Sequence, residues 1–110
     1  FTKIIKYLRS ISVVDLAIPF YLSLKEIDNY KFATPLDKAI LGTAFFRRIN
    51  LDAKVYMTKS NTYIGFNMNN TPMLLNVSTM VITHGKEADD AFLKDPLRYV
   101  FNDRYSEVFV

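Results

Sequence analysis

The chain of 110 residues has no cysteine and no tryptophan, one histidine and only three glycines. Without cysteine it can form no disulfide framework, no thiolate metal site and no cysteine nucleophile. A single histidine also excludes sites that need two imidazoles, which include most zinc sites. These absences point away from an enzyme, and we expect no metal and no cofactor.

Long apolar runs are missing as well. The longest apolar stretch, residues 11–24, is interrupted by Asp15 and Pro19, whereas a membrane-spanning helix needs ~20 consecutive apolar residues. The first residues lack the basic, apolar and small-residue order of a signal peptide. We therefore expect a soluble protein that contacts no membrane and lies inside a cell or within a viral particle. The chain is rich in Asn and Tyr and poor in Gly, a composition that fits an A/T-rich coding genome, including those of many viruses.

The residues that are present suffice for a core. Half of them are hydrophobic and 15% are aromatic, so the chain can bury enough apolar surface to offset its ordering entropy. The length fits one small domain over residues 1–110, because two halves would each lack a core.

Helical periodicity dominates the first half of the chain. Residues 3–9 form an amphipathic pattern, and residues 11–18, rich in Val and Ile, lead into Pro19, which is suited to open a second helix that ends near Asp28. Thr34, as N-cap, and the Pro that follows it predict a longer helix to residue 49. Gly42 inside this helix indicates close packing against another element, since glycine costs about 1 kcal/mol there relative to alanine.

Alternation of the strand type follows. It predicts strands at residues 53–58, 63–66, 73–77 and 80–82, with a turn at 67–72. Two short helical pieces are expected at 88–93 and 96–103. The predicted fold class is α+β, with N-terminal helices packed on a small antiparallel sheet and a short helical tail.

Residues 34–79 resemble the core of the transglutaminase-like superfamily, which shares the papain-type arrangement. In that family a helix begins at a nucleophilic cysteine, and an alanine, an arginine and an Ala-Arg-Val strand follow at fixed spacings. A strand that begins with histidine and one that ends in aspartate come next. The residues at matching positions here are Ala39, Arg47, Asn50, Ala53, Lys54 and Val55, then Asn61-Thr62-Tyr63 and Leu75-Asn76-Val77-Ser78.

The three catalytic positions of that family carry other residues. Pro35 stands at the cysteine position, Asn61 at the histidine position and Asn76 at the aspartate position. Proline supplies no nucleophile, and an asparagine amide takes up no proton near neutral pH. The resemblance thus implies a domain that lacks the catalytic triad, a transglutaminase-like pseudoenzyme. We expect it to serve protein–protein interaction or to be a structural component of an assembly such as a virion.

Other candidate chemical groups are weaker. His84 lies beside a glycine and is interpreted as a turn residue. Glu87, Asp89 and Asp90 are acidic neighbours without the spacing of a calcium loop, which favours the charged first turn of a helix. We therefore predict no catalytic residues and no metal site.

The formal net charge of +3 leaves a second function open. The alternative to a protein-binding role is a small basic nucleic-acid-associated module. Its cations would be Lys3, Lys6, Arg9, Arg47 and Arg48. The opposing interpretation is a solvated basic face without a ligand.

The tail after residue 95 is rich in aromatic side chains. We predict that it forms a contact surface for a protein partner or for a second copy of the chain, because aromatic anchors are enriched in interfaces. The predicted anchors are Tyr99, Phe101, Tyr105 and Phe109. The alternative is that the tail folds back and closes the open side of the sheet.

Overall fold

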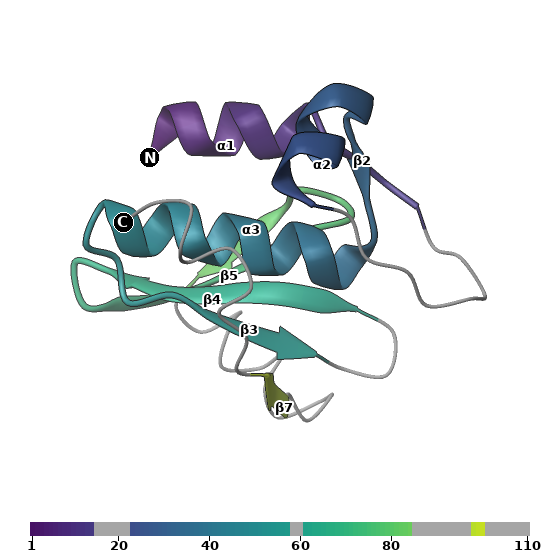
Figure 1. Cartoon of the computed structure of the whole chain (residues 1–110). Helices are drawn as coiled ribbons and strands as arrows, with labels where there is room; N and C mark the ends of the chain where they lie inside the picture. Colours follow the sequence, from purple (N-terminus) through teal and green to yellow (C-terminus); the bar gives the residue numbers. More distant parts are fainter. Residues whose placement is uncertain (15–22, 58–60, 85–97, 101–110) are drawn as a thin grey trace.

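The computed structural model describes residues 1–14, 23–57, 61–84 and 98–100 (Figure 1). In these residues helices come first and antiparallel strands follow, which confirms the α+β class. The bounds are α1 Thr2–Arg9, β1 Ser12–Val13, α2 Leu24–Tyr30, β2 Phe32–Ala33, α3 Pro35–Arg48, β3 Lys54–Met57, β4 Thr62–Met68, β5 Thr71–Asn76, β6 Ile82–His84 and β7 Arg98–Val100.

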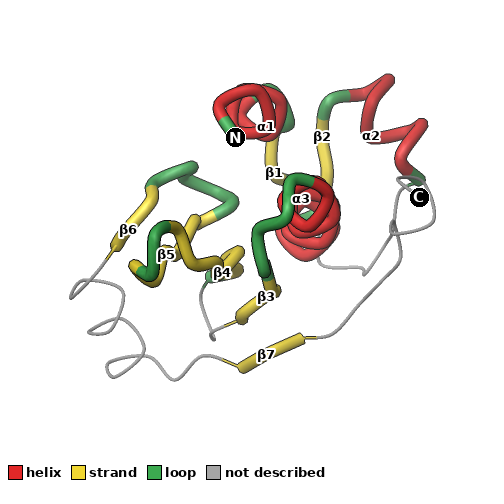
Figure 2. The backbone as a smooth tube through the Cα atoms, turned by 90° about the vertical axis from the view of Figure 1, so that its left-hand side faces the viewer, coloured by secondary structure: helices red, strands yellow, loops and turns green. Residues whose placement is uncertain are grey.

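The elements are stacked in layers around α3. Figure 2 shows α3 end-on, with α1 and α2 above it and the sheet below it. The short strands β1 and β2 pair in parallel beside the helices, an element that the sequence pattern did not predict. Helix α3 is therefore covered on two sides, and eight of its residues are buried.

The larger sheet has the order β6-β5-β4-β3-β7 among the described strands, and every pair in it is antiparallel. The β4–β5 hairpin turns at Asn69 and Asn70, whose φ angles are 53° and 64°. Two successive positive φ angles are typical of the two-residue turn that matches strand twist, and asparagine tolerates them well. The predicted turn is confirmed, with longer strands on either side than expected.

Close packing at Gly42 joins the three layers. A Cβ atom at this position would lie 2.5 Å from Cδ1 of Ile64 on β4 and 3.0 Å from Cδ1 of Leu8 on α1. Both neighbouring side chains are fully buried. The close approach expected from this glycine is therefore confirmed, and it brings α1 and β4 to the same point of α3.

An aromatic cluster fills the core where α3 ends. The ring of Phe46 lies 5.6 Å from that of Phe1 and 5.1 Å from that of Phe66, measured between centroids. The rings of Phe1 and Phe66 are 5.8 Å apart. Aromatic pairs at such distances add to the free energy gained by burial.

The predicted helical tail is wrong where the structure describes it. Arg98–Val100 form strand β7, which pairs antiparallel with β3 through Val55, Tyr56 and Met57. Aromatic and β-branched residues such as Tyr99 and Val100 favour strands. The free edge of β3 supplies hydrogen-bond partners that no local pattern reveals. The helical piece predicted at 88–93 lies outside the described residues.

Two predicted boundaries also differ. The second helix was expected to open at Pro19, which lies outside the described residues, but α2 starts at Leu24 behind a Ser23–Glu26 capping box. In this motif each residue's side chain accepts a hydrogen bond from the backbone N–H of the other. The last strand of the hairpin series covers Ile82–His84 rather than 80–82, because Met80 has a φ angle of 59° and belongs to the preceding turn.

In the described ranges, no helix has the length and apolar content that crossing a membrane requires.

Candidate functional site

The start of α3 is built as the sequence predicts. Thr34 caps the helix, and its Oγ1 accepts a hydrogen bond of 3.2 Å from the backbone N–H of Asp37. Pro35 occupies the first helical position, where its fixed φ fits the helix and its missing N–H leaves no helical bond unmade. The residue at the family's nucleophile position thus stabilises the helix start.

The two asparagines at the family's histidine and aspartate positions bond each other. The Asn76 side-chain amide donates to Oδ1 of Asn61 over 3.2 Å. Asn76 pairs in register with Tyr63, two residues after Asn61, so the pairing of β5 with β4 places the amides side by side. Both are half-buried. Each half-buried amide therefore has a hydrogen-bond partner in the other.

Asn76 also organises the turn that follows β5. Its Oδ1 accepts from the backbone N–H groups of Ser78, at 2.9 Å, and Thr79, at 3.2 Å. Its backbone carbonyl accepts from Met80 at 2.8 Å. Such side-chain bonds two and three residues along the chain are the usual asparagine turn chemistry. The amide orientation is therefore fixed from both sides.

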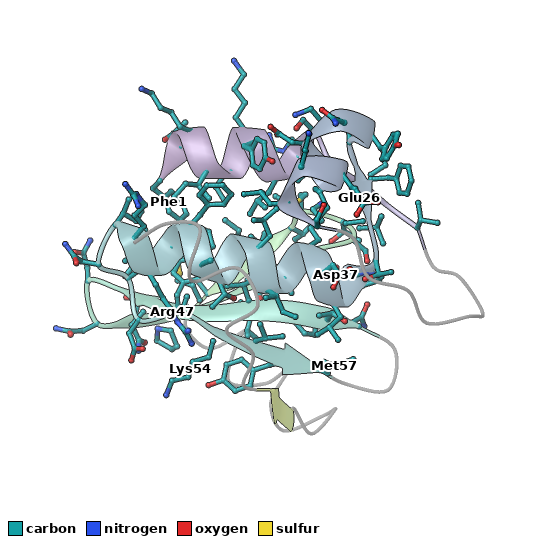
Figure 3. All side chains as sticks on the ribbon, viewed as in Figure 1. Phe1, Glu26, Asp37, Arg47, Lys54 and Met57 are labelled. Carbon is teal, nitrogen blue, oxygen red and sulfur yellow. The ribbon has the colours of Figure 1, made fainter. Side chains whose placement is uncertain are left out.

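All three family positions lie at one end of the fold. Met57 pairs with Thr62, so the chain around Asn61 lies at the Met57 end of the sheet. Figure 3 shows Met57 and Asp37, in the first turn of α3, at this same end of the molecule. The start of α3, the start of β4 and the end of β5 thus lie at the same end of the fold.

The three family positions themselves carry no acid, base or nucleophile. Two amides and a proline cannot exchange a proton near neutral pH. In the described part of the chain no three His, Cys, Asp or Glu side chains gather closely enough to hold a metal ion. His84 ends β6 as an exposed strand residue instead of a turn residue. Glu87, Asp89 and Asp90 lie outside the described residues.

A buried lysine near the start of α3 was not anticipated. Lys38 is 2% exposed, and its Nζ donates a hydrogen bond of 2.9 Å to the backbone carbonyl of Ile11. Burial disfavours the charged amine and lowers the pKa of Lys38 to about 8. The sequence pattern alone does not predict this burial, because a helix that is covered on two sides buries positions that would face water on a surface helix.

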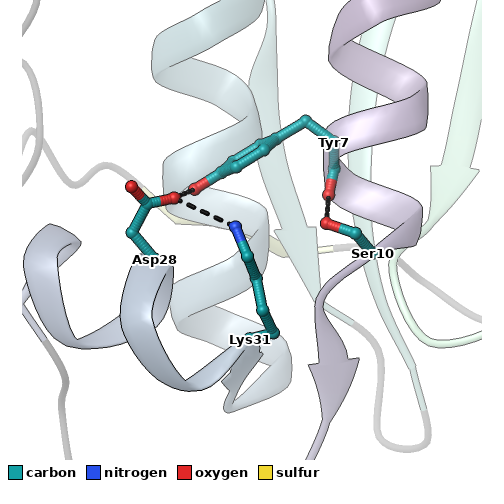
Figure 4. A network of polar contacts seen from close by, with 4 residues as sticks. All are labelled: Tyr7, Ser10, Asp28 and Lys31. Atoms are coloured by element: carbon teal, nitrogen blue, oxygen red, sulfur yellow. Dashed lines mark hydrogen bonds and ion pairs between the residues drawn. The ribbon is translucent and has the colours of Figure 1, made fainter.

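A polar network ties α1 to α2 on the face of α3 that points away from the sheet (Figure 4). The Tyr7 hydroxyl donates to Oδ1 of Asp28 over 2.8 Å, and Lys31 Nζ donates to the same oxygen over 3.2 Å. Burial, followed by the bond to the carboxylate, raises the pKa of Tyr7. The bonds from Tyr7 and Lys31 hold the pKa of Asp28 below its ordinary value. The network is structural, since it positions the two helices.

The basic residues do not share one face. Lys3, Lys6 and Arg9 are exposed on α1, above α3. Arg47 lies on the sheet side of α3 (Figure 3), where its Nε donates to the carbonyl of Ala53 over 3.1 Å. The expected group of five cations is therefore divided by α3.

Of the predicted tail anchors, the structure describes only Tyr99, whose backbone pairs with Tyr56 in the sheet. Phe101, Tyr105 and Phe109 lie outside the described residues. Comparisons of the chain with models of protein families, with curated proteins and with solved structures each gave no match.

Proposed function

We propose that this chain is a catalytically inactive transglutaminase-like domain that acts in protein–protein contact or as a structural part of an assembly, within a cell or a viral particle. The observation that carries the proposal is the bond between Asn61 and Asn76 at the end of the sheet where α3 begins. Two residues 15 apart in sequence meet where the resemblance requires its histidine and aspartate to meet.

Inactivity follows from the chemistry of these positions. The family's reaction needs a thiolate at a helix start, an imidazole that exchanges its proton, and a group that orients the imidazole. Pro35 supports the helix, and the two amides use their hydrogen-bonding groups on each other and on the turn after β5. In this proposal the three positions support the fold and carry no reactive group.

The thiol pKa of an introduced cysteine tests the family geometry. We compare Pro35→Cys alone with Pro35→Cys combined with Asn61→His and Asn76→Asp, and measure alkylation rate against pH. If the positions converge, the imidazole lowers the thiol pKa by about one unit or more relative to the single variant, starting from ~8.5. Leu24→Cys, at the first position of α2, is the control, since it shares a capped helix start and has no such partner.

The outcomes separate cleanly. An equal thiol pKa in the single and triple variants contradicts the family geometry. We expect the triple variant to show little acyl-transfer turnover, because efficient catalysis needs positioning to ~0.5 Å and a supporting shell of bonds. Brisk turnover would show that the site is still organised for catalysis, and acyl transfer by the unmodified chain would refute the proposal.

The contact role is tested with the tail. Strand β7 covers the edge of β3, so a chain ending at Asp95 exposes backbone groups of residues 55–57. If residues 96–110 serve only to bind a partner, the shortened chain stays folded and monomeric and loses its companion or its self-association in sedimentation. Unfolding or aggregation of the shortened chain assigns the tail to the fold.

The alternative function, a nucleic-acid-associated module, now depends on α1. Its three exposed cations favour it, whereas Arg47 is engaged on the other side of α3. Retention on single-stranded RNA or duplex DNA at low salt that weakens steeply with added salt would support it. Absence of retention at low salt would remove it.

A further inference from the structure

A hollow of about 220 Å³ opens between α1 and α3. Lys3, Ile4 and Tyr7 line it from α1, and Phe45 lines it from α3. The rings of Tyr7 and Phe45 meet edge to face, with centroids 5.3 Å apart. The Tyr7 hydroxyl is bonded to Asp28, so Tyr7 contributes mainly its apolar ring to the lining. The lining suits a large apolar side chain.

The surroundings of the hollow are positively charged. Helix α1 contains three basic residues and no acidic one. At about 100° per residue, Lys3 lies about 40° from Tyr7, Lys6 about 100° from it and Arg9 about 160° from it, so Arg9 is the cation farthest from the hollow. The Lys31 ammonium lies 5.0 Å from the centroid of the Tyr7 ring but is paired with Asp28, so the positive charge offered beside the hollow is that of Lys3 and Lys6. An occupant of this hollow therefore meets an apolar floor and a basic rim.

We infer that this hollow binds an acidic peptide segment of a partner protein through one apolar anchor side chain. The inference names the partner surface of the proposed protein-contact role and rests on that role. An apolar side chain in a pocket, ringed by complementary charges, is the usual anatomy of a protein hot spot. A nucleic acid fits less well, because the lining offers no polar group except Lys3 for reading base edges.

The experiment uses a fluorescein-labelled peptide in which a central Leu-Leu pair is flanked on both sides by glutamates, and reads binding to the full chain by anisotropy. We expect Lys3→Glu with Lys6→Glu to weaken binding about tenfold or more, and Arg9→Glu to change it less than about threefold. A peptide with serines in place of the leucines should bind about tenfold more weakly. Circular dichroism and the unfolding midpoint verify that each variant is folded.

Amide chemical shifts locate the site. On addition of the peptide, the largest changes are expected at Ile4, Tyr7 and Phe45, with little change along β5. Equal losses for Arg9→Glu and the double variant, unchanged binding of the serine peptide, or no binding by the unmodified chain overturns the inference. Tighter binding of single-stranded RNA than of the peptide, abolished by the same double variant, assigns the surface to nucleic acid and overturns it as well.

Failure here leaves the proposed function testable on its own. The thiol pKa experiment reports on Pro35, at the N-terminal end of α3, and on Asn61 and Asn76, at the adjoining end of the sheet. None of the three lines the hollow. If the thiol pKa shifts as expected and the peptide does not bind, the domain is retained as an inactive relative whose partner uses another surface. If the peptide binds and the thiol pKa is unchanged, the result supports the binding surface but not the transglutaminase-like assignment.

Discussion

The two ends of α3 are held by different kinds of contact. At its C-terminal end, Phe46 is fully buried between the rings of Phe1 and Phe66. At its N-terminal end, the contacts are polar: the Thr34 cap and the bond from Lys38 to the carbonyl of Ile11. Apolar burial tolerates small changes of geometry, whereas each polar bond depends on one partner at one distance.

This difference assigns separate roles to the two ends. The aromatic end supplies stabilisation through area removed from water. The polar end fixes where the helix begins and ties its first turn to the segment between α1 and β1. We expect substitutions at the aromatic end to cost more free energy of unfolding, and substitutions at the polar end to change geometry and pH dependence.

The largest expected effect is that of Phe46→Ala. Removal of a fully buried ring that contacts two others should lower the free energy of unfolding by about 3–5 kcal/mol. Urea denaturation measures it, and Phe45→Ala on the neighbouring, half-buried position is the control. An effect of Phe46→Ala no larger than that of Phe45→Ala would contradict the importance assigned to the aromatic end.

Lys38→Met tests the buried amine of the polar end. In the folded chain the pKa of Lys38 is about 8, below the ordinary 10.5, so between these values the unfolded chain binds more protons and stability rises with pH. We expect the free energy of unfolding of the unmodified chain to increase by about 1–3 kcal/mol over this window. The increase should be absent in Lys38→Met and retained in Lys25→Met, whose side chain is exposed.

Measurements between pH 7 and about 9 avoid most tyrosine titration. A flat profile for the unmodified chain would show that the amine is hydrated. An equal rise in Lys38→Met would assign the pH dependence to another group. Below pH 8 the difference in free energy of unfolding between the unmodified chain and Lys38→Met should be constant, because the amine is then protonated in both the folded and the unfolded chain.

The amide pair predicts an asymmetry between two similar substitutions. Asn76→Ala removes the acceptor of two backbone N–H groups as well as the bond to Asn61, and should cost about 2 kcal/mol. Asn61→Ala removes the bond between the amides and should cost about 1 kcal/mol. Thermal or urea unfolding of both variants compares them. Equal losses would mean that the turn after β5 does not depend on the Asn76 side chain.

Local chemistry made α3 and the hairpin predictable from the sequence. Thr34 followed by proline marks a helix start without tertiary information, and asparagine pairs mark a turn that needs positive φ angles. The Ser23–Glu26 capping box is also visible in the sequence, where Pro19 offers a competing helix start. Strand β7 could not be predicted from the sequence, because it depends on an open sheet edge at β3. The burial of Lys38 could not be predicted either, because it depends on a second layer over α3. The Asn61–Asn76 bond depends on the pairing of β5 with β4, which the periodicity of each strand does not specify.

The smallest expected effect is at the cap of α3. Thr34→Ala removes the acceptor for the backbone N–H of Asp37 and should lower the free energy of unfolding by about 1 kcal/mol. Thr34→Ser keeps the hydroxyl and should stay within about 0.5 kcal/mol of the unmodified chain. The two Thr34 variants can also be combined with Pro35→Cys. Loss of the cap in Thr34→Ala should let the helix start fray and raise the thiol pKa toward ~8.5, whereas Thr34→Ser should leave the thiol pKa unchanged. A thiol pKa that ignores the cap would mean that packing, and not the polar bonds, fixes this end of α3.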